Sequence, residues 1–169
     1  AENLAQAFWP GPLTLVLPRL AAASLSSLVT AGAATVAVRV PAHPVAQRLL
    51  KQFDGAIAAP SANPSGQISP TRAAHVIEGL GKTVSEVLDA GPCDVGLEST
   101  IVGIEDPEST PRLLRPGGLT REDIEQHLGV ALETYQTPGL ISAPGQLASH
   151  YSPKARLRLN ATDWTGDEH

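Results

Sequence analysis

The feature that most constrains the fold of this chain is a series of short apolar segments bounded by prolines and other turn formers. The first segment, 13–17 (LTLVL), lies between Pro12 and Pro18, and the second, 35–40 (TVAVRV), ends before Pro41. Short apolar runs between turn formers are typical of strands that are buried in a sheet. We therefore predict a strand in each segment.

Further strands and helices alternate along the rest of the chain. Additional strands are expected at 55–59 (small residues, buried), 84–89 (alternating, half exposed), 100–104 and 112–114. Apolar spacing and capping residues predict helices at 44–53 with Pro44 in the first turn, at 72–80 capped by Thr71, and at 121–128 opened by Thr120 and ended by Gly129. Strands that alternate with helices at this pace predict an α/β domain with a mixed sheet.

The composition limits the class of protein. Hydrophobic residues make up 42% and charged residues 17% of the 169 residues, which excludes an intrinsically disordered chain. No stretch approaches the roughly 18 consecutive apolar residues that a membrane helix needs. The net charge of −5 argues against nucleic-acid binding over a broad basic surface. Cys93 is the single cysteine and is interpreted as structural, the scattered histidines predict no metal site, and the expected compartment is the cytoplasm.

The character of the sequence changes after residue 135. We predict a first domain at 1–135, and a linker at 136–153 that is rich in turn formers and shows no sustained period. An alternating basic segment then predicts the start of a second, truncated α/β domain at 154–169. The chain begins at Ala1 and contains no methionine, so we expect it to be cut at both ends.

The first candidate for a functional site is the loop 60–71 (PSANPSGQISPT). It offers the hydroxyls of Ser61 and Ser69 and the amide of Asn63 directly before an expected helix, and such groups can bind an anion together with helix N–H groups. The loop also follows an expected buried strand, and ligands bind beyond the carboxyl ends of strands in open α/β sheets. The alternative is a solvated turn whose Ser and Asn side chains bond to their own backbone.

Arginines at strand ends give further candidates. Arg115 ends an apolar strand before the turn Pro-Gly-Gly, where it suits a phosphate or carboxylate, or instead a surface carboxylate of the protein. Arg39 lies in an apolar strand four residues after Thr35, so both side chains face the same way. A buried guanidinium needs an anionic partner in the protein or a ligand. Ser99 lies at the start of a strand, where it is either a ligand contact or a choice of β propensity.

Several chemistries have no motif in this chain. It contains no P-loop lysine motif, no Gly-x-Gly-x-x-Gly after a strand and no nucleophile elbow. We therefore predict no covalent catalytic residue. The candidate residues offer positioning and charge stabilisation, which is what phosphoryl or nucleotidyl transfer requires.

Together the segments FWPGPLTLVL, TVAVRVPAHP, APSANPSGQISPT, GLESTIVG and LLRPGG resemble the YrdC-like domain of threonylcarbamoyl-AMP synthases, from Phe8 to about Thr134. SAPGQLASHYSPKA is similar to the linker of the two-domain members. The resemblance implies an open, twisted, mixed β-sheet with flanking helices around a large concave site. It also implies synthesis of threonylcarbamoyl-AMP and pyrophosphate from L-threonine, bicarbonate and ATP, for threonylcarbamoyl modification of adenosine in tRNA.

The resemblance also implies roles for the candidate residues. The ATP-binding residues would be Thr35, Ser61, Asn63, Ser69, Arg115 and, from the linker, His150 and Tyr151. The residues facing threonine would be Arg39, Ala59 (through its backbone) and Ser99. Mg²⁺ is expected to accompany ATP, and proteins of the tRNA-modification pathway are expected to take the product. Neither a membrane nor a stable nucleic-acid complex is expected.

This chain departs from the family pattern in one respect that bears on activity. Family members carry a Lys-x-Arg motif upstream, and none of Lys51, Lys82 and Lys154 lies in such a motif. A cationic pair there would neutralise charge on the α-phosphate as pyrophosphate leaves. We therefore expect little or no synthase activity from these residues alone. The alternatives are a carbamoyltransferase domain that handles a carbamoyl adenylate, and a non-catalytic RNA- or nucleotide-binding module.

Overall fold

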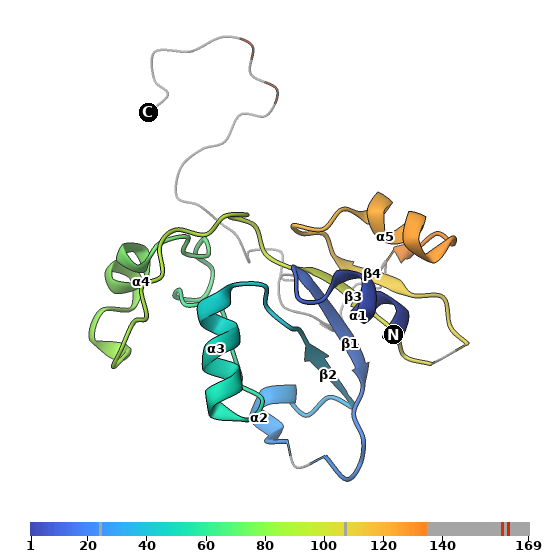
Figure 1. Ribbon diagram of the computed structural model, residues 1–169, viewed down its shortest axis with the longest axis horizontal. Coiled ribbons are helices and arrows are strands. Elements are labelled where there is room, and N and C mark those ends of the chain that lie inside the picture. The colour runs from blue at the N-terminus through green and yellow to red at the C-terminus, as the bar shows by residue number, and fades with distance from the viewer. Residues whose placement is uncertain (24, 107, 135–159, 161, 163–169) are drawn as a thin grey trace.

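A mixed sheet forms the centre of the computed structural model, which describes residues 1–23, 25–106, 108–134, 160 and 162. Within these residues the strands are β1 (Leu13–Pro18), β2 (Thr35–Val38), β3 (Thr100–Gly103), β4 (Arg112–Arg115) and β5 (Glu133–Thr134). Their order in the sheet is β2-β1-β3-β4-β5 (Figure 1). β1 pairs antiparallel with β2 and parallel with β3, β3 pairs antiparallel with β4, and β4 pairs parallel with β5. The predicted α/β class with an open, mixed sheet is therefore confirmed.

Helices flank the sheet. The described helices are α1 (Glu2–Phe8), α2 (Ser27–Thr30), α3 (Pro44–Phe53), α4 (Ala73–Leu80) and α5 (Arg121–Leu128), with a 3₁₀ turn at Gly81–Thr83. The bounds predicted for α3 and α5 are confirmed. At α5 the Thr120 hydroxyl accepts from the Asp123 amide at 3.1 Å, and Gly129 ends the helix at φ 70°. None of the described helices has the length and apolar character to cross a membrane.

Two predicted strands are wrong. Residues 55–59 and 84–89 form no strand, and 55–59 are exposed throughout. Strands need a partner for their backbone groups, and no described segment pairs with either stretch. The loop 60–71 therefore does not follow a strand, and the expectation that it lies beyond the carboxyl end of a buried strand is wrong. The bounds of α4 also differ by one residue, because Arg72 and not Thr71 occupies the N-cap position.

One face of the sheet carries the main core. The helices α1 and α5 lie next to each other over this face (Figure 1). Buried side chains from the strands, from the residues that adjoin them and from both helices meet there, namely Leu4, Leu13, Leu15, Val102, Ile104, Ile124 and Leu132. On the other face Val16 and Ile101 form a small cluster with Leu114. The buried β1 and β3 therefore provide a rigid base for the residues at their ends.

Helix α5 is tied to the segment that leads into β5 by a charged pair. The Arg121 guanidinium donates to Glu125 Oε1 at 2.6 Å and to the Leu132 carbonyl at 2.5 Å, and Glu125 Oε1 accepts from the Leu132 amide at 2.8 Å. The bond from Arg121, followed by that from the Leu132 amide, holds the pKa of Glu125 below its ordinary value of 4.5.

A pH-dependent loss of stability follows from this pKa. A carboxyl whose pKa is lower in the folded state contributes stability above its unfolded pKa, and the contribution is lost as the pH falls through the folded pKa. The melting temperature should therefore fall as the pH drops below 4.5, and Glu125→Gln should reduce this pH dependence while lowering the melting temperature at pH 7. Thermal unfolding of both proteins across this range measures the effect. An equal dependence of the melting temperature on pH in the wild type and in Glu125→Gln would contradict this expectation.

Candidate functional site

Arg115 and Ser99 meet at one edge of the sheet. β1 and β3 begin at this edge, and the antiparallel β4 ends there with Arg115. The Ser99 carbonyl accepts from Arg115 Nε at 3.2 Å and from Nη2 at 2.7 Å. Nη2 also donates to the Ser99 hydroxyl oxygen at 3.3 Å. The structure thus brings together two of the residues predicted for different substrates, one for ATP and one for threonine.

A buried threonine of β1 completes this group. Thr14 is 8% exposed, and its hydroxyl oxygen lies 2.7 Å from that of Ser99. Thr14 carries no signal of this role in the sequence, because it lies inside an apolar run and its partner is 85 residues away in the chain. Ser99 itself is only half buried, so its hydroxyl lies between the sheet interior and solvent. We call Thr14, Ser99 and Arg115 the hydroxyl–arginine cluster.

The segment that carries Ser99 is held on both sides. The buried Thr100 hydroxyl donates to the Leu119 carbonyl at 2.5 Å and accepts from the Leu119 amide at 3.1 Å. The Gly118 amide donates to the Glu98 carbonyl at 2.8 Å. Gly117 lies so close to 98–100 that a Cβ atom there would be 2.4 Å from the Glu98 carbonyl oxygen. The Pro-Gly-Gly turn therefore packs directly against the backbone that positions Ser99.

The loop 60–71 is organised by Asn63. Its Nδ2 donates to the carbonyls of Pro64 and Gln67, each at 3.0 Å, and its Oδ1 is buried without a partner among the described residues. Both amide hydrogens are thus occupied by the loop backbone. The remaining group, Oδ1, can only accept a hydrogen bond, so it cannot bind a phosphate oxygen directly. In this conformation Asn63 can therefore affect a ligand by shaping the loop, or by accepting a hydrogen bond from a donor group of the ligand at Oδ1.

The remaining predicted residues lie on separate segments. Thr35 is half buried at the start of β2, opposite Pro18, whereas Ala59 and Ser61 are exposed and Ser69 is half buried. Arg39 follows the end of β2 at Val38 and is exposed, so the expectation of a buried arginine is wrong. It needs no anionic partner for its stability, because water solvates its charge. The hydrogen bonds described above for the cluster do not include these residues, and His150 and Tyr151 lie outside the described residues.

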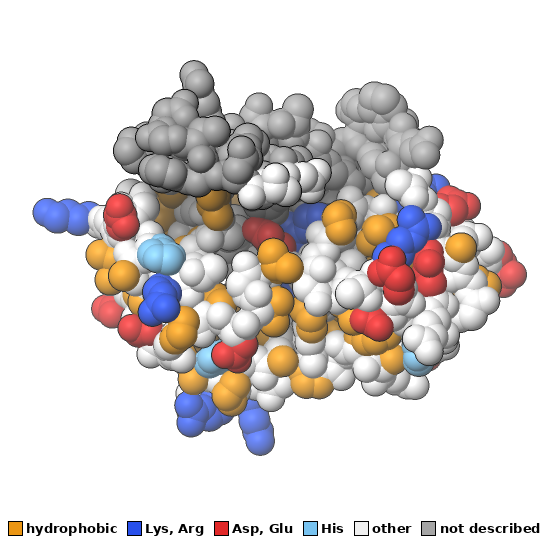
Figure 2. Space-filling model, turned by 90° about the horizontal axis from the view of Figure 1, so that it is seen from above, with side chains coloured by type: hydrophobic (Ala, Val, Ile, Leu, Met, Phe, Trp, Pro, Cys, Tyr) orange, Lys and Arg blue, Asp and Glu red, His pale blue; other side chains and the backbone are white. Residues whose placement is uncertain are grey.

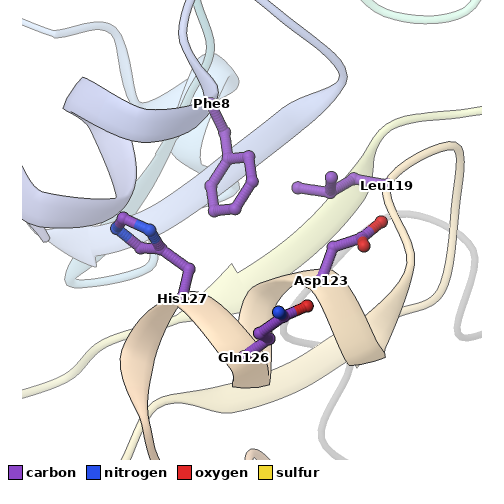
Figure 3. Close-up of a pocket in the computed structure, with 5 residues that line it drawn as sticks. All are labelled: Phe8, Leu119, Asp123, Gln126 and His127. Atoms are coloured by element: carbon purple, nitrogen blue, oxygen red, sulfur yellow. The ribbon is translucent and has the colours of Figure 1, made fainter.

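Two described pockets lie away from the predicted residues. Figure 3 shows the first, of about 530 Å³, between α1 and α5, lined by Phe8, Leu119, Asp123, Gln126 and His127. Two of its polar side chains have partners, since His127 Nε2 contacts Asn3 Oδ1 and the Thr120 hydroxyl donates to Asp123 Oδ2. The second, of about 200 Å³, adjoins the start of α4. Figure 2 shows a recess in the face that it views, with basic and acidic side chains at the floor of the recess.

The described residues contain no group of three or more His, Cys, Asp or Glu side chains that could hold a metal ion. Mg²⁺ at nucleotide sites is usually held by phosphates, waters and one or two carboxylates, without a dedicated cage of protein ligands. The donors of the hydroxyl–arginine cluster fit anionic oxygens better than a cation, since a guanidinium only donates. The arrangement therefore suits a ligand that carries phosphate or carboxylate groups.

Two family models match the chain. A model named Sua5_yciO_yrdC and described as "Telomere recombination" matches residues 1–117. A model described as "Threonylcarbamoyl-AMP synthase, C-terminal domain" matches residues 119–168. The two matches together extend over nearly the whole sequence, and the first contains the hydroxyl–arginine cluster and the loop 60–71.

Curated relatives and a solved structure agree with these models. The chain is 44% identical over 165 residues to a threonylcarbamoyl-AMP synthase of Bacillus subtilis, covering 94% of this chain and 46% of the relative. It is 44% identical over 161 residues to the enzyme of the same name from Pyrococcus abyssi, covering 93% and 46%. The crystal structure of P. abyssi Sua5 complexed with L-threonine superposes with a TM-score of 0.83 at 43% identity, covering 91% and 45%. The chain thus spans under half the length of these relatives.

Proposed function

The chain belongs to the Sua5/YciO/YrdC family, and we propose that it supplies part of the substrate site of an L-threonylcarbamoyladenylate synthase. Such an enzyme condenses L-threonine, bicarbonate and ATP into threonylcarbamoyl-AMP and pyrophosphate, for threonylcarbamoyl modification of adenosine in tRNA. One observation carries the proposal. Over more than nine-tenths of its length the chain is 44% identical to two proteins named as threonylcarbamoyl-AMP synthases.

The chemistry of this reaction fits the residues of the site. The threonine amine attacks the bicarbonate carbon and water leaves, which gives a carbamate. A carbamate oxygen then attacks the α-phosphorus of ATP while pyrophosphate leaves. No covalent protein intermediate is needed, so catalysis depends on positioning and on stabilising negative charge. Arg115 would contribute a fixed cation toward the phosphates, and Ser99 a hydroxyl toward threonine. The proposed site also includes Thr35, Arg39, Ala59, Ser61, Asn63, Ser69, His150 and Tyr151.

The surroundings of the reaction are also proposals. Mg²⁺ would enter with the phosphates of ATP and neutralise their charge. The product would pass to proteins that modify tRNA in the cytoplasm, without a stable nucleic-acid complex of this chain. The domain boundaries at residues 135 and 153, and the low activity expected of these residues alone, stay predictions.

The test is pyrophosphate release by the full-length gene product that carries these residues. We expect release that requires L-threonine, bicarbonate and ATP together, and that stops when any one is omitted. Release that depends on carbamoyl phosphate and not on L-threonine would contradict the synthase and favour a carbamoyltransferase. Absence of turnover with salt-dependent RNA binding by residues 1–135 would contradict it in favour of a binding module.

A further inference from the structure

We propose that Thr14 is a positioning residue, which fixes the Ser99 hydroxyl so that its proton points toward the bound substrate. The inference rests on the proposed function, because it concerns the same site. Thr14 is buried at 8% exposure on β1, between β2 and β3 in the sheet. Its 2.7 Å contact with the Ser99 hydroxyl is what connects it to the site.

The donor and acceptor groups available in the hydroxyl–arginine cluster determine the direction of each hydrogen bond. A guanidinium has donors and no acceptor, so the 3.3 Å contact from Arg115 Nη2 occupies one lone pair of the Ser99 hydroxyl oxygen. Between Thr14 and Ser99 either oxygen could donate. If Ser99 donated, the Thr14 proton would require another acceptor, and no other is found for it among the described residues. A buried hydroxyl proton without an acceptor is costly.

The favoured arrangement therefore has Thr14 donating to Ser99. The Ser99 hydroxyl oxygen then accepts from both Thr14 and Arg115, which uses both of its lone pairs. Its own proton is left to point away from the two donors, and Ser99 is half exposed. In this state Ser99 is an obligate donor to an acceptor oxygen of the substrate. A donor that is already aligned costs less to order on binding than a freely rotating one.

The structure also explains why the position is suited to this task. Thr14 pairs with Ile101 across the parallel β1–β3 ladder, and Thr100 beside Ser99 is fully buried. The backbone on both sides of the Thr14–Ser99 contact is thus held by the sheet. Because threonine is β-branched, few side-chain rotamers are open to it in a strand, and its hydroxyl is held in one direction.

Two substitutions separate this role from packing. Thr14→Val keeps the shape of the side chain and removes the hydroxyl, whereas Thr14→Ser keeps the hydroxyl and removes a methyl group. In the full-length gene product we expect Thr14→Val to raise the KM for L-threonine about tenfold or more, with a smaller change in the KM for ATP. Thr14→Ser should restore the KM for L-threonine to within about threefold of wild type, although it loses packing.

The outcomes distinguish this inference from the proposed function. An active wild type together with an unchanged KM for L-threonine in Thr14→Val would overturn the positioning role alone. Equal losses in Thr14→Val and Thr14→Ser would also overturn it, because both would then act through packing. If the wild type shows no turnover, titration calorimetry measures the affinity for L-threonine instead. A lower affinity in Thr14→Val than in the wild type supports the inference. A wild type that neither binds L-threonine nor turns over contradicts both.

Discussion

Replacing Gly117 by alanine is expected to lower kcat/KM for threonylcarbamoyl-AMP synthesis about a hundredfold, because it displaces the backbone that carries Ser99. A Cβ atom at Gly117 would lie 2.4 Å from the Glu98 carbonyl oxygen and 2.5 Å from Ser99 C and Thr100 N. These are backbone atoms and cannot rotate away, so the turn or the segment 98–100 must shift. The shift also costs about 1–3 kcal/mol of stability. Steady-state kinetics of the full-length gene product, with a thermal melt, measures both effects.

Gly118→Ala is the matched control in the same turn. The added Cβ atom would lie nearest to Val95 Cγ1, at 2.9 Å, which is the end of a side chain that can move. The hydrogen bond from the Gly118 amide to the Glu98 carbonyl would remain. We expect its kcat/KM to stay within about threefold of wild type. A Gly117→Ala protein that melts as a folded protein and retains wild-type kcat/KM would show that the close packing of the turn is irrelevant to the site.

Removing the Arg115 side chain is expected to lower kcat about a hundredfold to a thousandfold, the range found when a single stabilising donor is deleted from an active site. Its guanidinium makes bonds to both the carbonyl and the hydroxyl of Ser99. Arg115→Lys should recover little of the loss, because an ammonium group is a single point and cannot reproduce the planar fork of donors. Pyrophosphate release by the full-length gene product at saturating ATP gives the comparison.

Arg112 provides the control for Arg115, three residues earlier on the same strand. It pairs with Glu105 at 3.3 Å and with Glu133 at 3.5 Å, in both cases through partly exposed side chains. Such surface pairs contribute at most about 1 kcal/mol. Arg112→Ala should therefore leave kcat within about twofold of wild type. If it loses as much as Arg115→Ala, the effect belongs to the strand and not to the site.

The elements that the sequence predicted correctly have local signals. β1 and β3 are apolar runs that lie in the core. The ends of α3 and α5 are marked by residues that favour helix ends, namely Pro44 at the start of α3 and Thr120 and Gly129 on either side of α5. The predicted strands at 55–59 and 84–89 failed, because an extended segment becomes a strand only when another strand pairs with it. α1 was not predicted, since its one buried side chain, Leu4, packs in a core shared with α5 and the strands.

In the candidate site too, residues with a local signal in the sequence were predicted correctly, and residues that depend on distant partners were not. Arg115 was predicted at the end of a strand and lies there, whereas the burial of Arg39 was inferred from its apolar neighbours and is wrong. Thr14 had no local signal, because its role depends on Ser99, which approaches it only through the parallel pairing of β1 and β3. Residues that act by positioning other residues are hidden in a single sequence for this reason.

The mass of the nucleotide product tests the proposed synthase reaction most directly. The full-length gene product would be incubated with ATP, Mg²⁺, ¹³C-labelled bicarbonate and L-threonine, and the adenylate identified by mass spectrometry. We expect an adenylate that carries one threonine and one labelled carbon, formed in equal amount with pyrophosphate and strongly reduced in Arg115→Ala. Formation of AMP or ADP alone, with neither threonine nor label attached to the nucleotide, would contradict it.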